Sequence, residues 1–214
     1  MGAVSGAPLN PSFGVEWVDL WRSRPRLRVG LPLPHPSRSA FDFQPMPGIY
    51  NPAVQAAIRE YRFSDFAELW QLDQECFEPG ISYSRAELMH YIRRRGAFTL
   101  VAEQEKSAEH QIAGFVIAER EQTSLGHIIT IDIGGKARRQ GLGSRLMEAA
   151  EQRLAQLGCP AVYLETAVNN QAAIAFYKRL GYFIVKTIPR YYQNRLDALV
   201  MAKKLSAQQQ RKFE

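Results

Sequence analysis

Residues 134–144 of the chain read Gly-Gly-Lys-Ala-Arg-Arg-Gln-Gly-Leu-Gly-Ser, and the assignment of the fold rests on this stretch. It follows a run rich in β-branched residues, His127–Ile133, and it leads into Gly141–Leu157, where apolar residues recur every four positions. This order predicts a strand, a glycine-rich turn and the longest helix of the chain. Glycine lets a backbone approach a ligand closely, and the unpaired amides of a helix start attract anions. The sequence therefore predicts a phosphate site at the turn, where Arg138 and Arg139 add positive charge.

Two well-known glycine motifs do not fit this turn. The dinucleotide-binding fingerprint needs a third glycine three residues after Gly143, and Leu146 stands there. The Walker-type loop needs Ser or Thr after its lysine, whereas Ala137 follows Lys136 and the upstream glycine is missing. A dinucleotide-dependent dehydrogenase and an NTPase are therefore not supported.

Strand-like and helix-like segments alternate on both sides of the turn. Strands are expected at residues 56–63, 98–103, 112–119, 127–133, 161–166, 182–186 and 196–203. Helices are expected after an N-cap at Ser64, from Ser84 to about Arg95, over 141–157 and over 170–180. Glycines 158 and 181 end the last two helices. The order βααβββαβαββ predicts an α/β chain with a mixed sheet.

The first 55 residues differ in composition from the rest. Nine of the twelve prolines lie in residues 1–52, which favours an extended chain and predicts a poorly ordered N-terminal extension. An arm that docks a partner through Trp17 and Trp21 is the alternative interpretation. A single domain over 56–205 and a polar tail over 206–214 complete the predicted organisation.

Composition narrows the class of protein further. With 214 residues, 46% hydrophobic and 22% charged, the chain is expected to build one packed core. It has no apolar run of about 20 residues and no secretory signal, so neither a membrane span nor export is expected. Cys76 and Cys159 are too far apart to suggest a zinc cluster or a disulfide framework, and a reducing cytoplasm is the expected location. The net charge of +6 favours polyanionic ligands without choosing among them, and the oligomeric state is left open.

A second motif lies 27 residues after Gly143 and reads Asn170-x-x-Ala173-x-x-x-Tyr177-x-x-x-Gly-Tyr182. On a helix, Asn170 and Tyr177 face the same way within about 20° and lie roughly 10 Å apart, so one ligand can touch both. Arg138-x-x-Gly-x-Gly143 resembles the acetyl-CoA pyrophosphate turn of the GNAT acyltransferase superfamily, and residues 164–182 resemble the corresponding GNAT stretch nearly residue for residue. This resemblance implies the GNAT fold, a mixed and mostly antiparallel sheet with helices on both faces, splayed between its fourth and fifth strands.

Two further segments resemble one branch of this superfamily, the protein N-terminal acetyltransferases and notably the ribosomal-protein-alanine type. Residues 190–201 are similar to its Y-Y…D-A…M hairpin, and residues 77–83 are similar to its F-P-x-x-Y loop, with insertions. The resemblance implies that Tyr83, Tyr191 and Tyr192 grip the backbone of a protein or peptide N-terminus, with a ribosomal protein as one such acceptor. No metal, nucleic acid or membrane partner is expected.

The same resemblance implies acetyl-CoA as the acyl donor and direct attack by the acceptor amine in a ternary complex. The expected acetyl-CoA contacts are Ile131, Asp132, Ile133, Arg138, Arg139, Gln140, Gly141, Leu142, Gly143, Ser144, Asn170, Ala173 and Tyr177. Backbone amides near residues 131–133 are expected to pair with the pantetheine arm and to polarise the acetyl carbonyl.

The resemblance places three candidates for proton transfer. Glu165 occupies the general-base position, and a surface or salt-bridged glutamate is the alternative. His127 is the rival base, because it stands where other acetyltransferases carry a glutamate or tyrosine and its ordinary pKa near 6.5 suits the task. Tyr177 matches the general acid that protonates the departing thiolate, and a packed core aromatic is the alternative. Cys159 is expected to be a structural residue of a helix-to-strand turn.

Three functions are compatible with these residues. A protein N-α-acetyltransferase is the leading hypothesis. A GNAT enzyme that acetylates a small amine, a polyamine or a lysine is the closest alternative. A non-catalytic acyl-CoA-binding or nucleic-acid-binding module is the third, but the sequence lacks the interleaved aromatic and basic residues of an RNA-binding sheet.

Overall fold

A computed structural model of the chain describes residues 56–77, 81–106, 109–192 and 195–205. The extension expected at 1–55 and the tail expected at 206–214 lie outside the described residues. In the described part, the strands are β1 (Ala56–Glu60), β2 (Ala97–Lys106), β3 (Glu109–Arg120), β4 (Gly126–Ile133), β5 (Ala161–Ala167), β6 (Phe183–Tyr192) and β7 (Leu196–Lys204). The helices are α2 (Phe66–Cys76), α3 (Arg85–Ile92), α4 (Leu142–Gln156) and α5 (Gln171–Arg179), with short 3₁₀ turns η1 (Phe63–Asp65) and η2 (Gly135–Ala137). The predicted order of strands and α-helices is confirmed.

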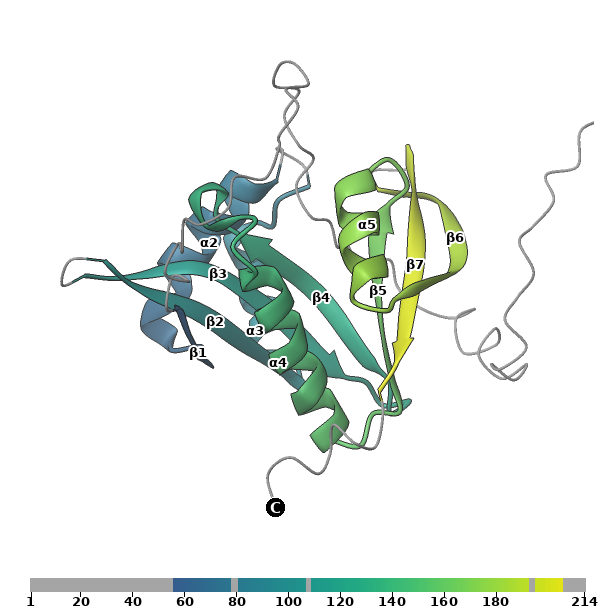
Figure 1. The fold of residues 1–214 in the computed structure, drawn as a ribbon, viewed down its shortest axis with the longest axis horizontal. Coiled ribbons are helices and arrows are strands. Elements are labelled where there is room, and N and C mark those ends of the chain that lie inside the picture. Colours follow the sequence, from purple (N-terminus) through teal and green to yellow (C-terminus); the bar gives the residue numbers. More distant parts are fainter. Residues whose placement is uncertain (1–55, 78–80, 107–108, 193–194, 206–214) are drawn as a thin grey trace, which may run out of the picture.

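The strands form one sheet in the order β1-β2-β3-β4-β5-β7-β6. All neighbouring strands are antiparallel except β4 and β5, which are parallel. β4 and β5 pair only at Gly126 with Val162 and at His127 with Tyr163, and beyond these residues the two strands separate (Figure 1). The mixed, mostly antiparallel sheet and its splay between the fourth and fifth strands are therefore confirmed.

A bulge in β4 lies where the splay begins. Ile117 of β3 pairs with Thr130, but the next residue of β3 pairs with Ile128, so Ile129 is an extra residue in β4. Ile128 packs into the core beneath α4, whereas Ile129 packs into the core beneath α2 and α3. Because a bulge shifts the alternation of side chains by one position, it decides which face each later residue of β4 occupies.

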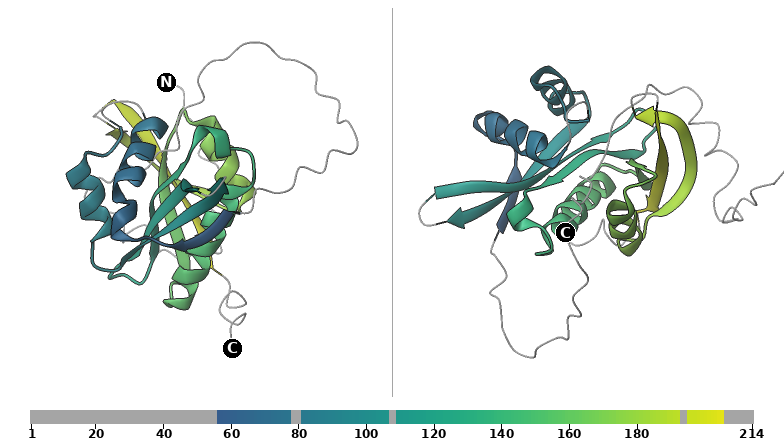
Figure 2. Two further views of the ribbon diagram at one scale, coloured as in Figure 1. Left: turned by 90° about the vertical axis from the view of Figure 1, so that its left-hand side faces the viewer. Right: turned by 90° about the horizontal axis from the view of Figure 1, so that it is seen from above.

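Helices cover both faces of the sheet, as expected. α4 and α5 lie on one face, and α2 and α3 lie on the other (Figure 2). The apolar stripe of α4 is fully or nearly fully buried and consists of Leu142, Leu146, Ala150 and Leu154. Since burial of such side chains is the main source of stability, the helix most strongly indicated by the sequence is also the one that anchors this face.

The N-terminal part of the domain begins differently from the prediction. β1 ends at Glu60 instead of residue 63, and Asp65, not Ser64, precedes helix α2. The Asp65 carboxylate accepts a hydrogen bond of 2.6 Å from the backbone amide of Arg62 and pairs with Arg59 at 2.7 Å. These contacts fold residues 63–65 into a 3₁₀ turn, which a serine cap would not have required.

The predicted capping box at Ser84 is confirmed, although α3 ends at Ile92 and not near Arg95. β6 is longer than predicted, because it continues through Pro189 to Tyr192 across two register irregularities. β6 is the outermost strand of the sheet beside β7, where a proline is tolerated because one edge needs no ladder hydrogen bonds.

Candidate active site

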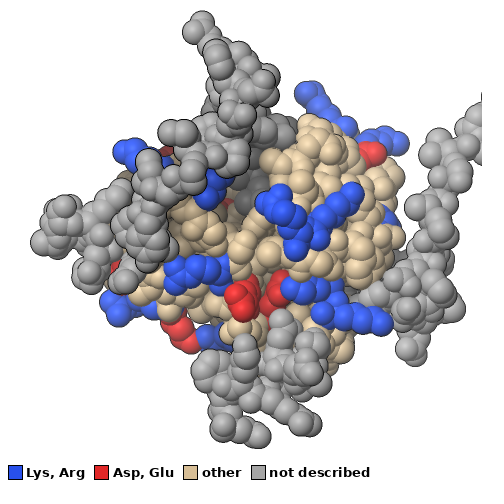
Figure 3. All heavy atoms as spheres, in the orientation of Figure 1, with Lys and Arg blue, Asp and Glu red and all other residues tan. Residues whose placement is uncertain are grey.

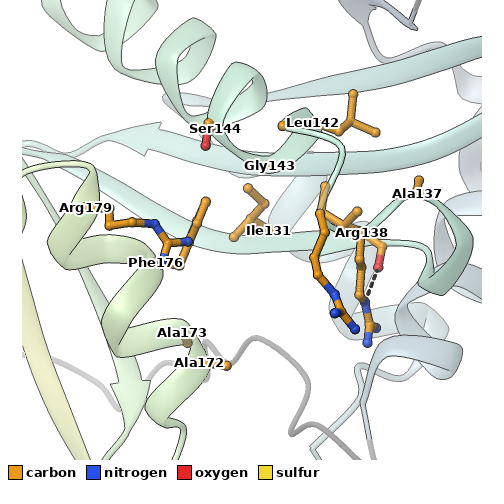
Figure 4. Close-up of a pocket in the computed structure, with 13 residues that line it drawn as sticks. Ile131, Ala137, Arg138, Leu142, Gly143, Ser144, Ala172, Ala173, Phe176 and Arg179 are labelled. Carbon is orange, nitrogen blue, oxygen red and sulfur yellow. Dashed lines mark hydrogen bonds between the residues drawn. The ribbon is translucent and has the colours of Figure 1, made fainter. Parts of the chain in front are cut away.

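A cavity of about 670 Å³ opens between the end of β4, the start of α4 and α5 (Figure 4). It is lined by most of the residues expected to contact acetyl-CoA, namely Ile131, Ile133, Arg138, Arg139, Gly141, Leu142, Gly143, Ser144 and Ala173. Four lining residues were not expected, namely Ala137, Ala172, Phe176 and Arg179. The glycine turn and the second motif of the sequence therefore meet at one cavity.

Glycine is required at positions 141 and 143 of the turn for different structural reasons. Gly141 has φ +79°, which L-amino acids adopt only at a cost, and a side chain there would meet no atom within 4 Å. Gly143 lies against α5, where an added Cβ would approach the Phe176 ring to 3.3 Å. The first glycine thus sets the start of α4, and the second keeps the cavity between α4 and α5 narrow. A phosphate group fits this arrangement, because the free amides of the helix start face the cavity.

Arg138 joins the turn to β4 and α2. Its Nε donates to the Ile133 carbonyl at 3.0 Å (Figure 4), and its Nη2 lies 3.7 Å from the Cys76 sulfur. Arg139 and Arg179 also line the cavity. Basic side chains predominate over acidic ones on the face shown in Figure 3, which favours an anionic ligand.

Some expected acetyl-CoA contacts do not line the cavity. Gln140 donates from Nε2 to the Lys136 carbonyl at 2.8 Å and so braces the turn. Asn170 is buried at the N-cap of α5, where its Oδ1 accepts from the Ala173 amide at 3.1 Å. Its carbonyl oxygen therefore positions the helix that carries Tyr177, and a direct contact of Asn170 with acetyl-CoA stays a prediction.

Tyr177 is fully buried, and its phenol oxygen has no hydrogen-bond partner among the described residues. Burial and the nearby charge of Asp132 raise the pKa of the phenol above 10. A neutral phenol with a free O–H is suited to donate a proton or a hydrogen bond. The unpartnered phenol is also the buried polar atom that a bound thioester sulfur would satisfy.

Glu165 and His127 form a hydrogen bond on the other side of the sheet from α4. His127 is fully buried in β4, and its Nε2 lies 2.9 Å from Oε2 of Glu165 in β5. Its Nδ1 lies 3.4 Å from Oε1 of Glu119 in β3, and Arg94 pairs with the other oxygen of Glu119 at 3.2 Å. The Tyr163 ring stacks on the imidazole with 4.4 Å between centroids.

A histidine between two carboxylates must be charged to donate to both, because only the imidazolium carries two N–H groups. Burial alone would disfavour that charge, but Glu165 and Glu119 outweigh burial and raise the pKa of His127 to about 9. The imidazole therefore has no free lone pair to accept a proton near pH 7. Glu165 and His127, proposed from the sequence as rivals, belong to one hydrogen-bonded group in which the carboxylate is the better acceptor.

A metal ion is a possible alternative for this group, since Glu119, Glu121 and His127 place one donor atom each within 4.8 Å of one another. The carboxylates are instead engaged by protein donors. Arg94 and His127 contact Glu119, and the Tyr163 hydroxyl donates to Glu121 at 2.5 Å. We therefore assign no metal site here.

The tyrosines expected to hold the acceptor are buried near the splay. Tyr191 and Tyr192 at the end of β6 contact each other edge to face, with 5.0 Å between ring centroids. Tyr83 precedes α3, and its backbone amide donates to the Asp73 carboxylate at 2.8 Å. Burial raises the pKa of the Tyr83 phenol, and the nearby groups Tyr91, Asp132, Asp73 and Tyr191 raise it further. Tyr83 and Tyr191 thus lie on the same side of the sheet as two buried aspartates.

Neither cysteine has the surroundings of a nucleophile. Cys159 is buried between α4 and β5, and its amide bonds to the Leu154 carbonyl at 3.0 Å, as a structural turn residue does. Cys76 is buried against β4, and burial together with Asp132 raises the pKa of its thiol to about 12. A thiol that stays protonated is a poor nucleophile.

Residues 66–182 match the Acetyltransferase (GNAT) family. The chain belongs to the GNAT acetyltransferase family. As a member of this family, the protein uses acetyl-CoA as its acyl donor. None of the described helices is long and apolar enough to cross a membrane.

Individual relatives agree with the family assignment. The chain is 31% identical over 138 residues to N-alpha-acetyltransferase 30 of Schizosaccharomyces pombe, which covers 63% of this chain and 86% of the relative. The ribosomal-protein-S18-alanine N-acetyltransferase of Escherichia coli superposes with a TM-score of 0.61 at 23% identity, over 71% of this chain and 94% of its own. Ard1 of Thermoplasma volcanium superposes with a TM-score of 0.62 at 24% identity, over 71% and 98%.

Sequence reasoning missed several residues of this GNAT site. Glu119 escaped notice because only the pairing of β3 with β4 brings it to His127. Phe176 precedes Tyr177 and is not part of the quoted motif, although Gly143 packs against its ring. Asp132 was expected to contribute only backbone, yet it is a carboxylate within a buried apolar strand, and that contrast was a usable signal.

Proposed function

We propose that this GNAT enzyme acetylates the α-amine at the N-terminus of a protein or peptide, by direct attack of the amine on the thioester of acetyl-CoA. The observation that carries the proposal is that the cavity and the candidate base Glu165 lie on opposite sides of the sheet, at the splay between β4 and β5. The acetyl-CoA cavity lies on the α4 side, lined by Ile131 and Ile133. Glu165 lies on the opposite side, two residues after Tyr163 and on the same face of β5.

The acceptor class is supported by the tyrosines and by the relatives. Tyr83 and Tyr191 border the splay on the side of Glu165, where their phenols could hold an extended backbone. Several similar proteins are named N-alpha-acetyltransferases, including the one from Schizosaccharomyces pombe. The Escherichia coli neighbour is named for a ribosomal protein, so a ribosomal-protein N-terminus is the first natural acceptor to test.

In the proposed mechanism, Glu165 accepts the proton that the acceptor ammonium must lose before it attacks. An α-ammonium titrates near pH 8, so a carboxylate base at moderate strength suffices. The His127 imidazolium donates to Glu165 at 2.9 Å and fixes its orientation. The first proton goes from nitrogen to the Glu165 carboxylate, and the electron pair of the neutral amine forms the C–N bond while the C–S bond of the thioester breaks. The nitrogen then loses a second proton, which balances the proton that the departing sulfur gains.

Tyr177 acts on the leaving group, the thiol of CoA. When bound, acetyl-CoA supplies an activated acyl group on a thiol whose ordinary pKa is near 8.5, so the leaving group needs only modest help. The phenol of Tyr177 donates its hydrogen bond or proton to that sulfur. Most of the acceleration then comes from holding amine and thioester together.

We assign the whole reaction to residues 56–205 and place it in the cytoplasm. Both cysteines are free and buried, which suits a reducing compartment. Residues outside this range take no part in the proposed chemistry.

The test is an acetylation assay with three kinds of acceptor. Purified enzyme and acetyl-CoA are incubated with peptides that have a free α-amine, with the same peptides blocked at the N-terminus but carrying lysine, and with spermidine. Mass spectrometry then locates the acetyl group. We expect acetylation of the free α-amines, at a rate about a hundredfold to ten-thousandfold lower for Glu165→Gln. Turnover of spermidine or lysine without any modified N-terminus would overturn the proposal.

A further inference from the structure

We propose that Asp132 and Asp73 form a seat for the ammonium group of the acceptor, beside the splay in the sheet. This inference rests on the proposed function and adds the group that recognises the positive charge of the amine. Asp132 lies in β4 and Asp73 lies in α2. Both side chains are fully buried.

Each aspartate has one oxygen that is already bonded and one that is not. Oδ1 of Asp132 accepts from the Thr130 hydroxyl at 2.8 Å, and Oδ2 of Asp73 accepts from the Tyr83 amide at 2.8 Å and from Gln74 at 2.9 Å. Oδ2 of Asp132 and Oδ1 of Asp73 have no hydrogen-bond partner among the described residues. A buried carboxylate oxygen without a donor is costly, so two of them indicate a missing cationic or protic partner.

α2 is anchored to β4 so that the two aspartates face the same region. The Cys76 thiol, three residues after Asp73 and on the same side of the helix, donates to the carbonyl of Ile133 at 3.4 Å. Ile133 is the neighbour of Asp132 in β4. The carboxylates also influence each other, because burial first and Asp73 second raise the pKa of Asp132.

No cation of the protein neutralises this pair in the described part of the chain. Arg138 is the basic residue whose charge acts on Asp132, but its Nε bonds to the Ile133 carbonyl and its Nη2 to Cys76. Burial raises the pKa of Asp73 to about 6 despite the hydrogen bonds that it accepts. Two buried carboxyls that face each other without a cationic partner gain most from a ligand that brings its own positive charge.

The location of the seat fits the acceptor amine and not the acetyl-CoA phosphates. Ile131 and Ile133 line the acetyl-CoA cavity, whereas Asp132, which stands between them in β4, is not among its lining residues. After burial, the charge of Asp132 is among the causes that raise the pKa of the unpartnered Tyr177 phenol and that of the Tyr83 phenol. A primary ammonium has three donors, so one such group can satisfy both free carboxylate oxygens.

The experiment measures peptide binding to enzyme saturated with CoA, which cannot react. Calorimetry compares a peptide that begins with a free α-amine with the same peptide carrying a hydroxyl at that position. A hydrogen bond to a charged group contributes about 1.5–3 kcal/mol, so Asp132→Asn should weaken binding of the amine peptide about tenfold to a hundredfold. The hydroxyl peptide should bind Asp132→Asn and the wild-type enzyme equally.

Asp65→Asn is the matched control, because Asp65 is a buried carboxylate of the same sheet face that already has a partner in Arg59. It should leave the affinities of both peptides unchanged. Asp73→Asn is a second variant and should also discriminate against the amine peptide, with an additional loss for both peptides because Asp73 fixes Tyr83. Acetyl-CoA binding reports that each variant is folded.

Equal losses for the two peptides, or no loss for Asp132→Asn, would overturn the ammonium seat. Acetylation of N-termini by wild-type enzyme together with that result would leave the proposed function standing. If the wild-type enzyme modifies only small amines, the proposed function fails, and the seat is tested with spermidine against an uncharged alcohol of similar length. A weaker affinity of Asp132→Asn for spermidine alone would then support the seat.

Discussion

Tyr177 and His127 are both fully buried, yet they differ in their partners. Tyr177 has a phenol oxygen without a partner among the described residues, whereas both ring nitrogens of His127 contact carboxylates. An unused buried donor is expensive to maintain, and a ligand is the simplest compensation. The role proposed for each residue therefore follows from whether its buried polar atoms have a hydrogen-bond partner in the protein.

Removal of the Tyr177 hydroxyl should affect the reaction more than binding. We expect Tyr177→Phe to lower kcat about tenfold to a hundredfold, at the low end of general-acid effects because a thiolate leaves readily. The Kd of acetyl-CoA should stay within about twofold of wild type. Tyr182→Phe is the control, since its hydroxyl already donates to Glu151 at 2.9 Å, and it should reduce stability without changing kcat. An unchanged kcat for Tyr177→Phe would rule out the proposed acid.

Glu119 should act on catalysis only through His127. Glu119→Gln keeps Glu165 but removes the anion beside Nδ1, so the pKa of the imidazole should fall below about 9. We expect the alkaline limb of the kcat/KM profile to move to lower pH, because the neutral ring cannot donate to Glu165 and to residue 119 together. Glu165→Gln should instead lower kcat/KM at every pH. A pH profile of Glu119→Gln that superposes on wild type would contradict this coupling.

At the scale of the element, the start of α4 lines the cavity proposed to bind acetyl-CoA, and the far end of the helix does not. Gly141 and Gly158 flank this helix with φ +79° and +80°, and a Cβ at either position would meet no atom within 4 Å. The two positions therefore have the same backbone requirement, and they differ in location.

Alanine at either glycine should destabilise the fold equally, by about 1–2 kcal/mol, since both impose a left-handed conformation on an L-residue. Only Gly141→Ala should also weaken acetyl-CoA binding, because it shifts the amides that face the cavity. Urea denaturation and calorimetry with acetyl-CoA measure the two effects. Equal acetyl-CoA affinities for the two variants would show that the α4 start does not bind the cofactor.

Element prediction succeeded where local signals exist. The Ser84 capping box and the periodic apolar stripe of α4 determine those helices by themselves. β6 extends past its predicted end because pairing with β7 continues across two irregularities and past Pro189. That pairing is a tertiary interaction, and the sequence around residue 189 carries no period that reveals it.

At the scale of the whole molecule, the buried imidazolium makes stability depend on pH. The folded pKa of His127 is about 9 against 6.5 in an unfolded chain, so the folded state holds this proton more tightly. Its contribution is complete below pH 6.5 and is lost as the pH rises to about 9. We expect the free energy of unfolding to fall by roughly 3 kcal/mol over that window. His127→Asn, followed by urea unfolding between pH 6 and pH 9.5, should remove this slope, and an unaltered slope would contradict the assignment.

The chain as a whole shows what a sequence can reveal about a site. The glycine turn and the segment between Asn170 and Tyr177 are local motifs, and residues of both line the cavity proposed to bind acetyl-CoA. The bond between His127 and Glu165 joins positions 38 residues apart and exists because β4 and β5 pair over two residues before they separate. The bulge at Ile129 decides on which face of the sheet Asp132 lies, and the sequence of β4 contains no pattern that predicts this bulge.

The most direct test of this account is a crystal structure with a CoA–peptide bisubstrate analogue. We predict that the pyrophosphate binds the amides at the start of α4, that the sulfur lies within hydrogen-bond distance of the Tyr177 phenol, and that the peptide's first nitrogen lies between Glu165 and Asp132. A pyrophosphate bound elsewhere, or a peptide nitrogen remote from both carboxylates, would contradict it.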